Sequence, residues 1–331
     1  MKGEQFTVVR LRLPPGLDAP SALALLRRET PDQISDLNHL YRLQQQAKPA
    51  SERNPYSCGT SRCYGQEMIG WPQALALCSA GVRVGILDTG IDTAHPALRG
   101  RNIISASFVA PPARRAETQH GTGVATLLVG TGAGGGVPGL LPSAQVYAAD
   151  VFHTAADGSQ SADAVTIARG LSWLAGQRVD VINISLAGSE NRLLTSAVEA
   201  VLARGISVVA AAGNDGPAAS PRHPGALPGV LAVTAIDRRK RPYRRAARGA
   251  HIAYAAPGVS IWTAQPRGRQ GVATGTSYAA PFVTAVIALL KKDSRIANPE
   301  TEDLGAPGRD EIFGQGLIRA PQHCGREVSR N

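Results

Sequence analysis

Short apolar runs rich in β-branched residues alternate with amphipathic segments from residue 82 onward. The apolar runs are 82–87, 145–151, 179–186, 206–212 and 230–236. Continuously apolar runs of this length predict strands that are buried on both faces, and their alternation with helices is typical of a mostly parallel sheet between two helical layers. The pattern therefore predicts a three-layer α/β fold, in which functional side chains lie beyond the carboxyl ends of the strands.

Three segments of the same region have helical patterns. Leu194, Ala197, Val198, Val201 and Leu202 follow the i, i+3, i+4, i+7, i+8 spacing, which predicts an amphipathic helix. The segment 162–177 fits this spacing less cleanly. Residues 282–290 are small or apolar on every side and predict a fully buried helix, with Pro281 expected in its first turn.

Residues 1–50 have a different character from the rest of the chain. Residues 6–13 alternate in the manner of a strand, 21–28 predict a short helix, 36–42 are amphipathic, and 44–55 are polar. We therefore predict an N-terminal appendage with a linker over residues 1–50 and a main domain over 51–331. The main domain begins with a loop bounded by Cys58 and Cys63 and a short helix around 72–77.

Length and charge narrow the possible classes of protein. A chain of 331 residues is long enough for one large domain, and it contains no apolar run of the roughly 20 residues that a membrane span needs. The net charge of +10 comes mainly from arginine, and seven basic residues lie between 238 and 248. Tyr243 is the one aromatic residue among these seven, and because the chain shows no nucleic-acid-binding fold we expect a solvated loop and no nucleic-acid partner.

Three motifs carry residues that suit nucleophilic catalysis. Asp88 follows the apolar run 82–87 in Asp-Thr-Gly, His120 opens an apolar helix in His-Gly-Thr-Gly-Val-Ala, and Ser277 lies in Gly-Thr-Ser-Tyr-Ala-Ala-Pro. Attack by a serine hydroxyl on an amide needs a base that takes its proton and an acid that orients the base. Taken alone, Ser277 is also explained as a helix N-cap. Asn214, in a Gly-Asn turn after the run 206–212, is placed to donate to a developing oxyanion.

Together these motifs resemble the subtilisin-like serine proteases, from about residue 65 to about residue 320. The resemblance implies that Asp88, His120 and Ser277 form a catalytic triad and that Asn214 stabilises the oxyanion. It implies a serine endopeptidase that binds a peptide or protein substrate as an extended strand. Substrate-binding residues implied in the same way are Ser185, Leu186, Ala187, Gly188, Gly158, Ser159, Gly213, Arg222 and Thr276. Residues 1–50 resemble the tail of a prodomain, which in this family assists folding and inhibits the enzyme before it is removed.

The sequence departs from this family at its strongest calcium site. Ala97 occupies a position where many members have aspartate, and the loop 131–136 is rich in glycine where they have polar ligands. Because calcium needs six or more oxygen ligands, we expect no metal ion and no other cofactor.

Four cysteines form an even set, namely Cys58, Cys63, Cys78 and Cys324. We expect disulfides between Cys58 and Cys63 and between Cys78 and Cys324, in a secreted or periplasmic monomer, although residues 1–12 lack the pattern of a signal peptide. The alternative is four reduced thiols in a cytosolic protein.

Position 222 lies in a region that, in this family, holds the side chain of the substrate residue just before the cleaved bond. The residue at this position departs from the family. Small residues are usual there, whereas this chain has Arg222 followed by His223. An inward Arg222 favours Asp, Glu or a small residue before the cut. If Asp215 pairs with Arg222 and neutralises its charge, Arg222 restricts only the size of the substrate side chain. If Arg222 points outward to water, it does not affect this preference.

Two other functions remain open at this stage. One is a non-catalytic binding module on a protease fold, which the intact triad disfavours. The other is a peptide ligase, which resolves the same acyl-enzyme with an amine.

Overall fold

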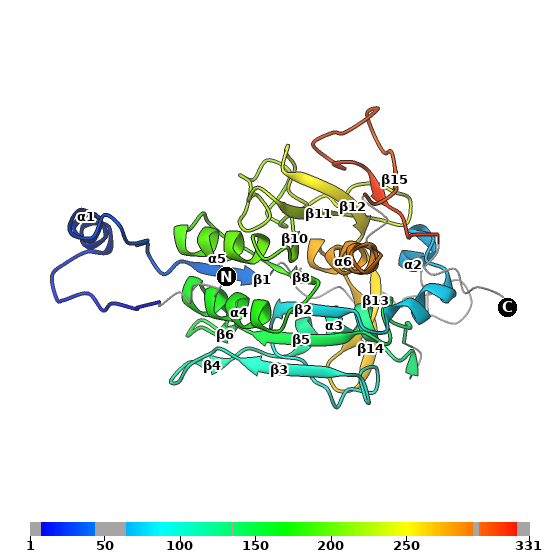
Figure 1. The fold of residues 1–331 in the computed structure, drawn as a ribbon, viewed down its shortest axis with the longest axis horizontal. Helices are drawn as coiled ribbons and strands as arrows, with labels where there is room; N and C mark the ends of the chain where they lie inside the picture. Colours follow the sequence, from blue (N-terminus) through cyan, green and yellow to red (C-terminus); the bar gives the residue numbers. More distant parts are fainter. Residues whose placement is uncertain (1–7, 44–63, 134–135, 294–297, 323–331) are drawn as a thin grey trace.

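A large, mostly parallel sheet forms the middle layer of the protein (Figure 1). The computed structural model describes residues 8–43, 64–133, 136–293 and 298–322. The strand order is β15-β16-β12-β11-β10-β8-β2-β5-β3. All neighbours in this sheet are parallel except β15 and β16. The strands are β2 (Arg83–Asp88), β3 (Ile103–Ser107), β5 (Gln145–Asp150), β8 (Val181–Ile184), β10 (Ser207–Ala211), β11 (Val230–Ile236), β12 (Ile252–Pro257), β15 (Thr301–Glu302) and β16 (Leu317–Ile318).

Helices cover both faces of this sheet. Helices α3 (Gln119–Val129) and α6 (Thr276–Lys292) lie on one face, and α4 (Ala164–Gly176) and α5 (Arg192–Leu202) lie on the other. Along β10, Val209 belongs to the apolar cluster around α6, whereas Val208 and Ala210 belong to the cluster around α4 and α5. Successive residues of a strand point to opposite faces, so a strand covered on both sides must be apolar throughout. The predicted three-layer α/β fold is confirmed.

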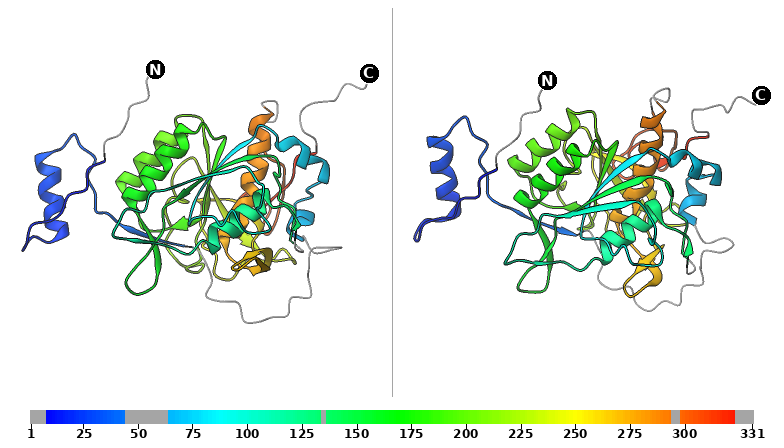
Figure 2. Two further views of the ribbon diagram at one scale, coloured as in Figure 1. Left: turned by 90° about the horizontal axis from the view of Figure 1, so that it is seen from below. Right: turned by 60° about the horizontal axis from the view of Figure 1, so that its bottom comes forward.

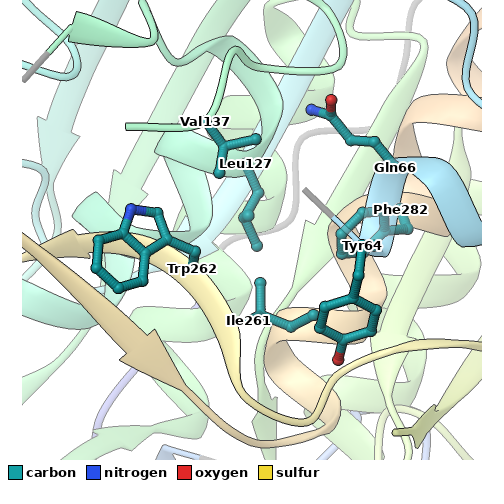
Figure 3. A pocket seen from close by; sticks show the side chains of 8 residues that line it. Tyr64, Gln66, Leu127, Val137, Ile261, Trp262 and Phe282 are labelled. Carbon is teal, nitrogen blue, oxygen red and sulfur yellow. The ribbon is translucent and has the colours of Figure 1, made fainter. Parts of the chain in front are cut away.

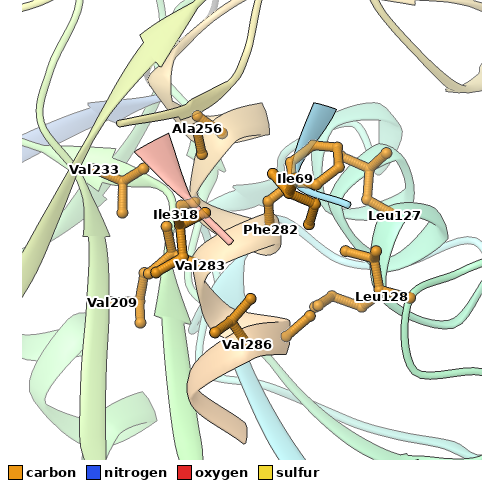
Figure 4. Packing of buried hydrophobic residues seen from close by; sticks show 14 of the residues in the cluster. Ile69, Leu127, Leu128, Val209, Val233, Ala256, Phe282, Val283, Val286 and Ile318 are labelled. Carbon is orange, nitrogen blue, oxygen red and sulfur yellow. The ribbon is translucent and has the colours of Figure 1, made fainter. Parts of the chain in front are cut away.

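Helix α6 lies at the centre of the larger apolar cluster. Every residue from Thr276 to Leu290 is buried. Figure 4 shows Val283 and Val286 beside strand residues such as Val209 and Val233, with Phe282 close to Ile69 and Leu127 of the chain around it. An almost wholly apolar helix is stable in water only when neighbours surround it in this way.

The predicted elements of the main domain agree closely with the observed ones. The run 230–236 coincides with β11, and the helix predicted from Leu194 to Leu202 is α5. The helical pattern 162–177 corresponds to α4, although Ala162 belongs to a strand. The short helix expected around 72–77 is the 3-10 helix η1 (Gln73–Ser79), and the unpredicted helix α2 (Tyr64–Met68) precedes it.

A second sheet contains a strand from the N-terminal part of the chain. Its order is β4-β6-β7-β1-β9, with β4 (Arg114–Arg115), β6 (His153–Thr154), β7 (Gln160–Asp163), β1 (Leu40–Leu43) and β9 (Leu186–Ala187). Strand β1 lies between β7 and β9 and is antiparallel to both. A separate hairpin joins β13 (Ile261–Gln265) to β14 (Arg269–Ala273).

The segment before β1 stands away from the main body. Helix α1 (Ala19–Glu29) matches the helix predicted over 21–28 and has no buried residue, and the views of Figure 2 show it apart from the other helices. The strand predicted over 6–13 is wrong for its described part, because residues 8–13 are not in a strand. Leu11 is 62% exposed there, so the alternating residues have no layer to pack against. The polar linker and the loop from Cys58 to Cys63 lie outside the described residues.

A buried hydrogen-bond chain connects α6 to β8 and continues toward Ser185. Thr284 Oγ1 donates to Asn183 Oδ1 at 3.0 Å, and Asn183 Nδ2 donates to Ser185 Oγ at 2.9 Å. We expect Thr284→Val to lower the free energy of unfolding by about 1–3 kcal/mol, because it leaves a buried amide oxygen without its donor. Urea unfolding in a Ser277→Ala background measures this change without proteolysis.

The matched control is Thr195→Val on α5. The Thr195 hydroxyl donates to the carbonyl of Asn191, which also accepts the Thr195 backbone N–H. Its removal leaves no buried acceptor without a donor, so we expect a change of less than about 0.5 kcal/mol. Equal losses in the two variants would contradict a special role for the chain through Asn183.

Candidate active site

Asp88 and His120 are in contact at the carboxyl end of strand β2, and Ser277 lies at the amino end of α6, next to Tyr278, whose ring contacts that of His120. Asp88 is the last residue of β2, while His120 and Ser277 lie in the first turns of α3 and α6. Helices α3 and α6 pack against each other, which brings their amino ends together. All three side chains are fully buried. The structure thus joins Asp88 to His120 and places Ser277 on the helix that packs against the helix of His120.

The contact between Asp88 and His120 fixes the imidazole. His120 Nδ1 lies 2.7 Å from Asp88 Oδ1 and 2.9 Å from Oδ2, so Nδ1–H donates to the carboxylate. This tautomer leaves a lone pair on Nε2, which is buried and has no hydrogen-bond partner among the described residues. Gly121 allows the close approach, because a Cβ there would lie 2.5 Å from the Thr89 carbonyl. The pair has the form of an oriented general base.

Ser277 lies inside helix α6 and is not its N-cap. The cap is Gly275, whose φ of 153° favours glycine. Ser277 Oγ donates to the Ser185 carbonyl at 3.4 Å. The positive end of the helix dipole lies next to this hydroxyl and stabilises negative charge on its oxygen.

Pro281 lies further along α6 than its predicted place in the first turn. The helix begins at Thr276, so Pro281 is beyond the residues whose N–H groups lack a helical acceptor. Proline has no backbone N–H, so residue 281 donates no i→i−4 hydrogen bond in this helix.

Asn214 is held in one orientation by Thr276. Thr276 N and Thr276 Oγ1 both donate to Asn214 Oδ1 at 3.1 Å, and Gly213 N donates to Thr276 Oγ1 at 3.3 Å. Because these contacts use Oδ1 as the acceptor, Nδ2 is the donor end of the amide. Gly213 has a φ of 114°, which lets the chain turn sharply at the end of β10.

Strand β1 occupies the groove between β7 and β9. Its register pairs Arg42 with Ala187 and Leu43 with Leu186. One further step along β9 reaches Ser185, whose carbonyl accepts from Ser277 Oγ. Strand β1 thus runs along β9 in the direction of Ser185, the residue that Ser277 contacts.

The strand on the other side of β1 is β7, which begins at Gln160. Leu40, Tyr41 and Arg42 pair with Asp163, Ala162 and Ser161. Gly158 and Ser159, which the sequence places at this edge, lie in the turn before β7 instead.

Comparisons with known proteins identify the family. The model for the subtilase family matches residues 79–314. The chain belongs to the subtilase family of serine endopeptidases. It is 35% identical over 252 residues to the M-protease of Shouchella clausii (strain KSM-K16), which is 74% of this chain and 64% of that protein. Subtilisin Savinase of Lederbergia lenta is also 35% identical over 252 residues, or 74% of this chain and 91% of the relative.

Two solved structures resemble this subtilase. Fervidolysin from Fervidobacterium pennivorans, a keratinolytic enzyme related to subtilisin, aligns with a TM-score of 0.69 and 25% identity over 84% of this chain and 50% of its own. The protease domain of PatA aligns with a TM-score of 0.58 and 32% identity over 65% of this chain and 80% of its own. The fold is therefore subtilisin-like.

Three residues before β1 tie the N-terminal segment to the subtilase domain. Asp36 Oδ2 accepts from Arg192 N at 2.8 Å, at the start of α5. Asn38 Oδ1 accepts from Val165 N at 3.2 Å, at the start of α4. Asn191 Nδ2 donates to the Leu37 carbonyl at 2.8 Å. Sequence reasoning did not assign these contacts, because they join residues that lie far apart in the chain.

Arg222 forms an ion pair with Asp215 at 2.9 Å, which is one of the arrangements considered from the sequence. Its side chain is 35% exposed, and its Cγ lies 3.5 Å from the position that a Cβ on Gly213 would occupy. Arg222 thus packs beside the turn that carries Asn214. His223, next in the chain, pairs through its backbone with Gly188, and burial lowers the pKa of its imidazole.

An apolar hollow lies apart from the catalytic candidates. Figure 3 shows Trp262, Ile261 and Leu127 around it, with Tyr64 and Phe282 on the opposite side. None of the residues predicted for the site lines this hollow. Among the described residues there is no group of three or more His, Cys, Asp or Glu side chains placed to hold a metal ion. Within the same residues, no helix is long and apolar enough to cross a membrane.

Proposed function

We propose that this subtilase hydrolyses peptide bonds through an acyl-enzyme in which Ser277 is the nucleophile. The observation that carries the proposal is the contact of Asp88 with His120, near an extended segment, β1, that is paired on both sides by β7 and β9. Backbone pairing on both sides of a peptide aligns it without regard to most of its side chains. The groove is therefore suited to protein substrates.

The residues divide the chemical work as follows. His120 Nε2 takes the proton as Ser277 Oγ attacks the carbonyl, and Asp88 stabilises the resulting imidazolium. Asn214 Nδ2 and the Ser277 backbone N–H donate to the oxyanion. His120 then returns the proton to the leaving amine, and the same base activates water to release the acyl group.

The N-terminal segment serves as an intramolecular inhibitor in this proposal. Strand β1 occupies the position of a substrate, and Asp36 and Asn38 hold the preceding residues on α5 and α4. A covalently attached segment is present at a high effective concentration, so modest contacts are enough to exclude other peptides. Removal of the segment by Ser277 activates the enzyme. The protein acts as a monomer in this proposal.

We expect Ser277→Ala to stop both self-cleavage and the cleavage of added peptides. We propose that the first cut follows Gln44, the residue after β1, so the wild-type chain should acquire a new N-terminus at Gln45. Loss of the nucleophile should lower turnover by about 10⁶-fold, the scale known for subtilisin itself. Mass spectrometry of the incubated protein and peptide products measures both events.

Ser207→Ala is the control, because Ser207 lies at the amino end of β10, away from the groove. It should shorten in the same way as the wild type. Cleavage of Ser277→Ala at a wild-type rate would overturn the proposed nucleophile, and peptide products joined through an amine would indicate ligation.

In this proposal the bulk of Arg222 limits the size of the substrate side chain just before the cleaved bond. Its charge has little effect because Asp215 forms an ion pair with it. We expect the wild type to cleave after Ala or Gln faster than after Phe, and Arg222→Gly to raise kcat/KM for Phe by about 10-fold or more. Asp215→Asn keeps the size and exposes the charge, so it should favour Glu instead. A wild-type preference for Phe that Arg222→Gly leaves unchanged would exclude Arg222 from the pocket.

We propose that the enzyme works without bound calcium. Ala97 supplies no side-chain oxygen, and Arg101 donates to the carbonyls of Gly130 and Pro142, which flank the glycine-rich loop. We expect EDTA to shift the melting temperature of the Ser277→Ala protein by less than about 2 °C. A fall of more than about 10 °C would show a tight site, because a tightly bound ion contributes several kcal/mol to stability.

Two disulfides and export from the cytosol complete the proposal. Cys78 is buried, and Cys58, Cys63 and Cys324 lie outside the described residues. Ala320 N donates to the Ile69 carbonyl at 2.8 Å, so the end of the described chain lies beside the segment that leads to Cys78. Non-reducing peptide mapping of protein from its native compartment should find Cys58–Cys63 and Cys78–Cys324. Four free thiols would contradict both the pairing and the location.

A further inference from the structure

A second buried carboxylate, that of Asp150, lies beside Asp88. Asp150 is the last residue of β5 and is in register with Asp88, the last residue of β2. Neighbouring strands lie about 4.8 Å apart, and residues in register on parallel strands point to the same face of the sheet. Asp150 is only 2% exposed, and Asp88 is fully buried. Two negative charges this close in a buried place are costly unless an opposite charge accompanies them.

Arg115 of β4 supplies the opposite charge. Its Nε donates to Asp150 Oδ2 at 2.5 Å, and Ser107 Oγ donates to the same oxygen at 3.1 Å. Within the described part of the chain, the buried Oδ1 of Asp150 has no hydrogen-bond partner, and Arg115 is the one basic residue in an ion pair with this carboxylate. The balance of charge at Asp150 therefore depends on a single guanidinium.

Gly90 lets this ion pair pack against the segment that holds the catalytic acid. A Cβ on Gly90 would lie 2.9 Å from Arg115 Nη2 and 3.4 Å from Asp150 Oδ2. Between Gly90 and Asp88 lies Thr89, whose backbone N–H donates to Asp88 Oδ1 at 2.7 Å. The ion pair thus borders the backbone that fixes the Asp88 carboxylate, and it does so without contacting the nucleophile or strand β1.

Other ionisable side chains lie on the elements around His120. The ring of Tyr278, on α6, has its centroid 5.2 Å from that of His120. Burial, and then the charge of Asp88, raises the pKa of Tyr278, so its phenol stays neutral. Asp92, in the loop after β2, accepts from Ala94 N at 3.0 Å and is thereby held in its own turn. Asp150 differs from both because it is buried and in register with Asp88.

An uncompensated charge at Asp150 would impair His120 in two ways. It would attract a proton to the imidazole of the resting enzyme, and a protonated imidazole cannot accept the proton of Ser277. It would also repel the carboxylate of Asp88 from its place next to Nδ1. A guanidinium on Asp150 removes both effects.

We propose that Arg115 is a positioning residue, which neutralises Asp150 and so leaves Asp88 as the one net negative charge behind His120. This inference rests on the proposed peptidase function. Arg115 acts through Asp88 and His120 and touches no reacting atom. What matters in this role is the balance of charge between Arg115 and Asp150, and not the presence of either side chain by itself.

The first variant is Arg115→Met, which removes the charge and keeps much of the length of the side chain. The full-length protein is incubated with a peptide of residues 38–47, and kcat is expressed per active site titrated with a fluorophosphonate. We expect kcat at pH 7 to fall by about 10-fold and KM to change by less than about 3-fold. The acid side of the pH profile of kcat/KM should move to higher pH by about 0.5 to 1 unit. The rate of reaction with the fluorophosphonate should fall in parallel with kcat.

The decisive variant combines Arg115→Met with Asp150→Asn. It lacks both charges, so we expect kcat and the pH profile to return to within about 3-fold and 0.3 unit of the wild type. Arg115→Lys keeps the charge and should also retain kcat within about 3-fold. The matched control is Arg241→Met, which breaks an exposed ion pair with Asp237 at 2.7 Å and should change neither kcat nor the pH profile.

The outcomes separate the two levels of the proposal. If the unmodified protein neither cuts the peptide nor reacts with the fluorophosphonate, the peptidase function fails and this inference fails with it. If the unmodified protein is active and Arg115→Met matches it, or if adding Asp150→Asn deepens the loss, the peptidase function stands and the role of Arg115 is overturned. If Arg115→Met does not fold, the other two variants decide: activity in both supports the balance of charge, and loss of activity in the double variant contradicts it.

Discussion

The burial of helix α6 is the constraint on which the site depends. A helix whose residues from Thr276 to Leu290 are all buried has to be enclosed by the sheet on one side and by other helices on the other. Its amino end is thereby fixed at the carboxyl end of the sheet, where Asp88 also lies. Ser277 is thus positioned by a packing requirement that involves many residues, and the groove around it needs little further support.

Much of the fold and the site could be predicted because the signals are local. The bounds of the apolar run 230–236 coincide with those of β11. Three short motifs contain Asp88, His120 and Ser277, and these motifs can be recognised without knowledge of any contact. The parallel sheet brings the segments that carry these residues to the same edge, and the alternation of strands and helices in the sequence already indicates such a sheet.

The parts that could not be predicted depend on contacts between residues far apart in the sequence. Strand β1 is four residues long, and nothing within it reveals that β7 and β9 will flank it. Likewise, Gly188 looks like an ordinary turn glycine until the ring of Tyr41 is placed against it. Pro281 lies beyond the first turn because the helix starts at Thr276, earlier than the apolar pattern indicates.

The contacts of Asp36 and Asn38 have a thermodynamic consequence for the mature domain. Their side chains accept from the backbone N–H groups of Arg192 and Val165, in the first turns of α5 and α4. A departing segment removes these acceptors, and the helix starts must then rely on Asn191, Asp163 and water. By linkage, whatever stability the segment lends to these helices equals the free energy with which the folded domain retains it. Binding of the segment therefore favours the folded domain, and a cleaved segment that diffuses away no longer contributes this stabilisation.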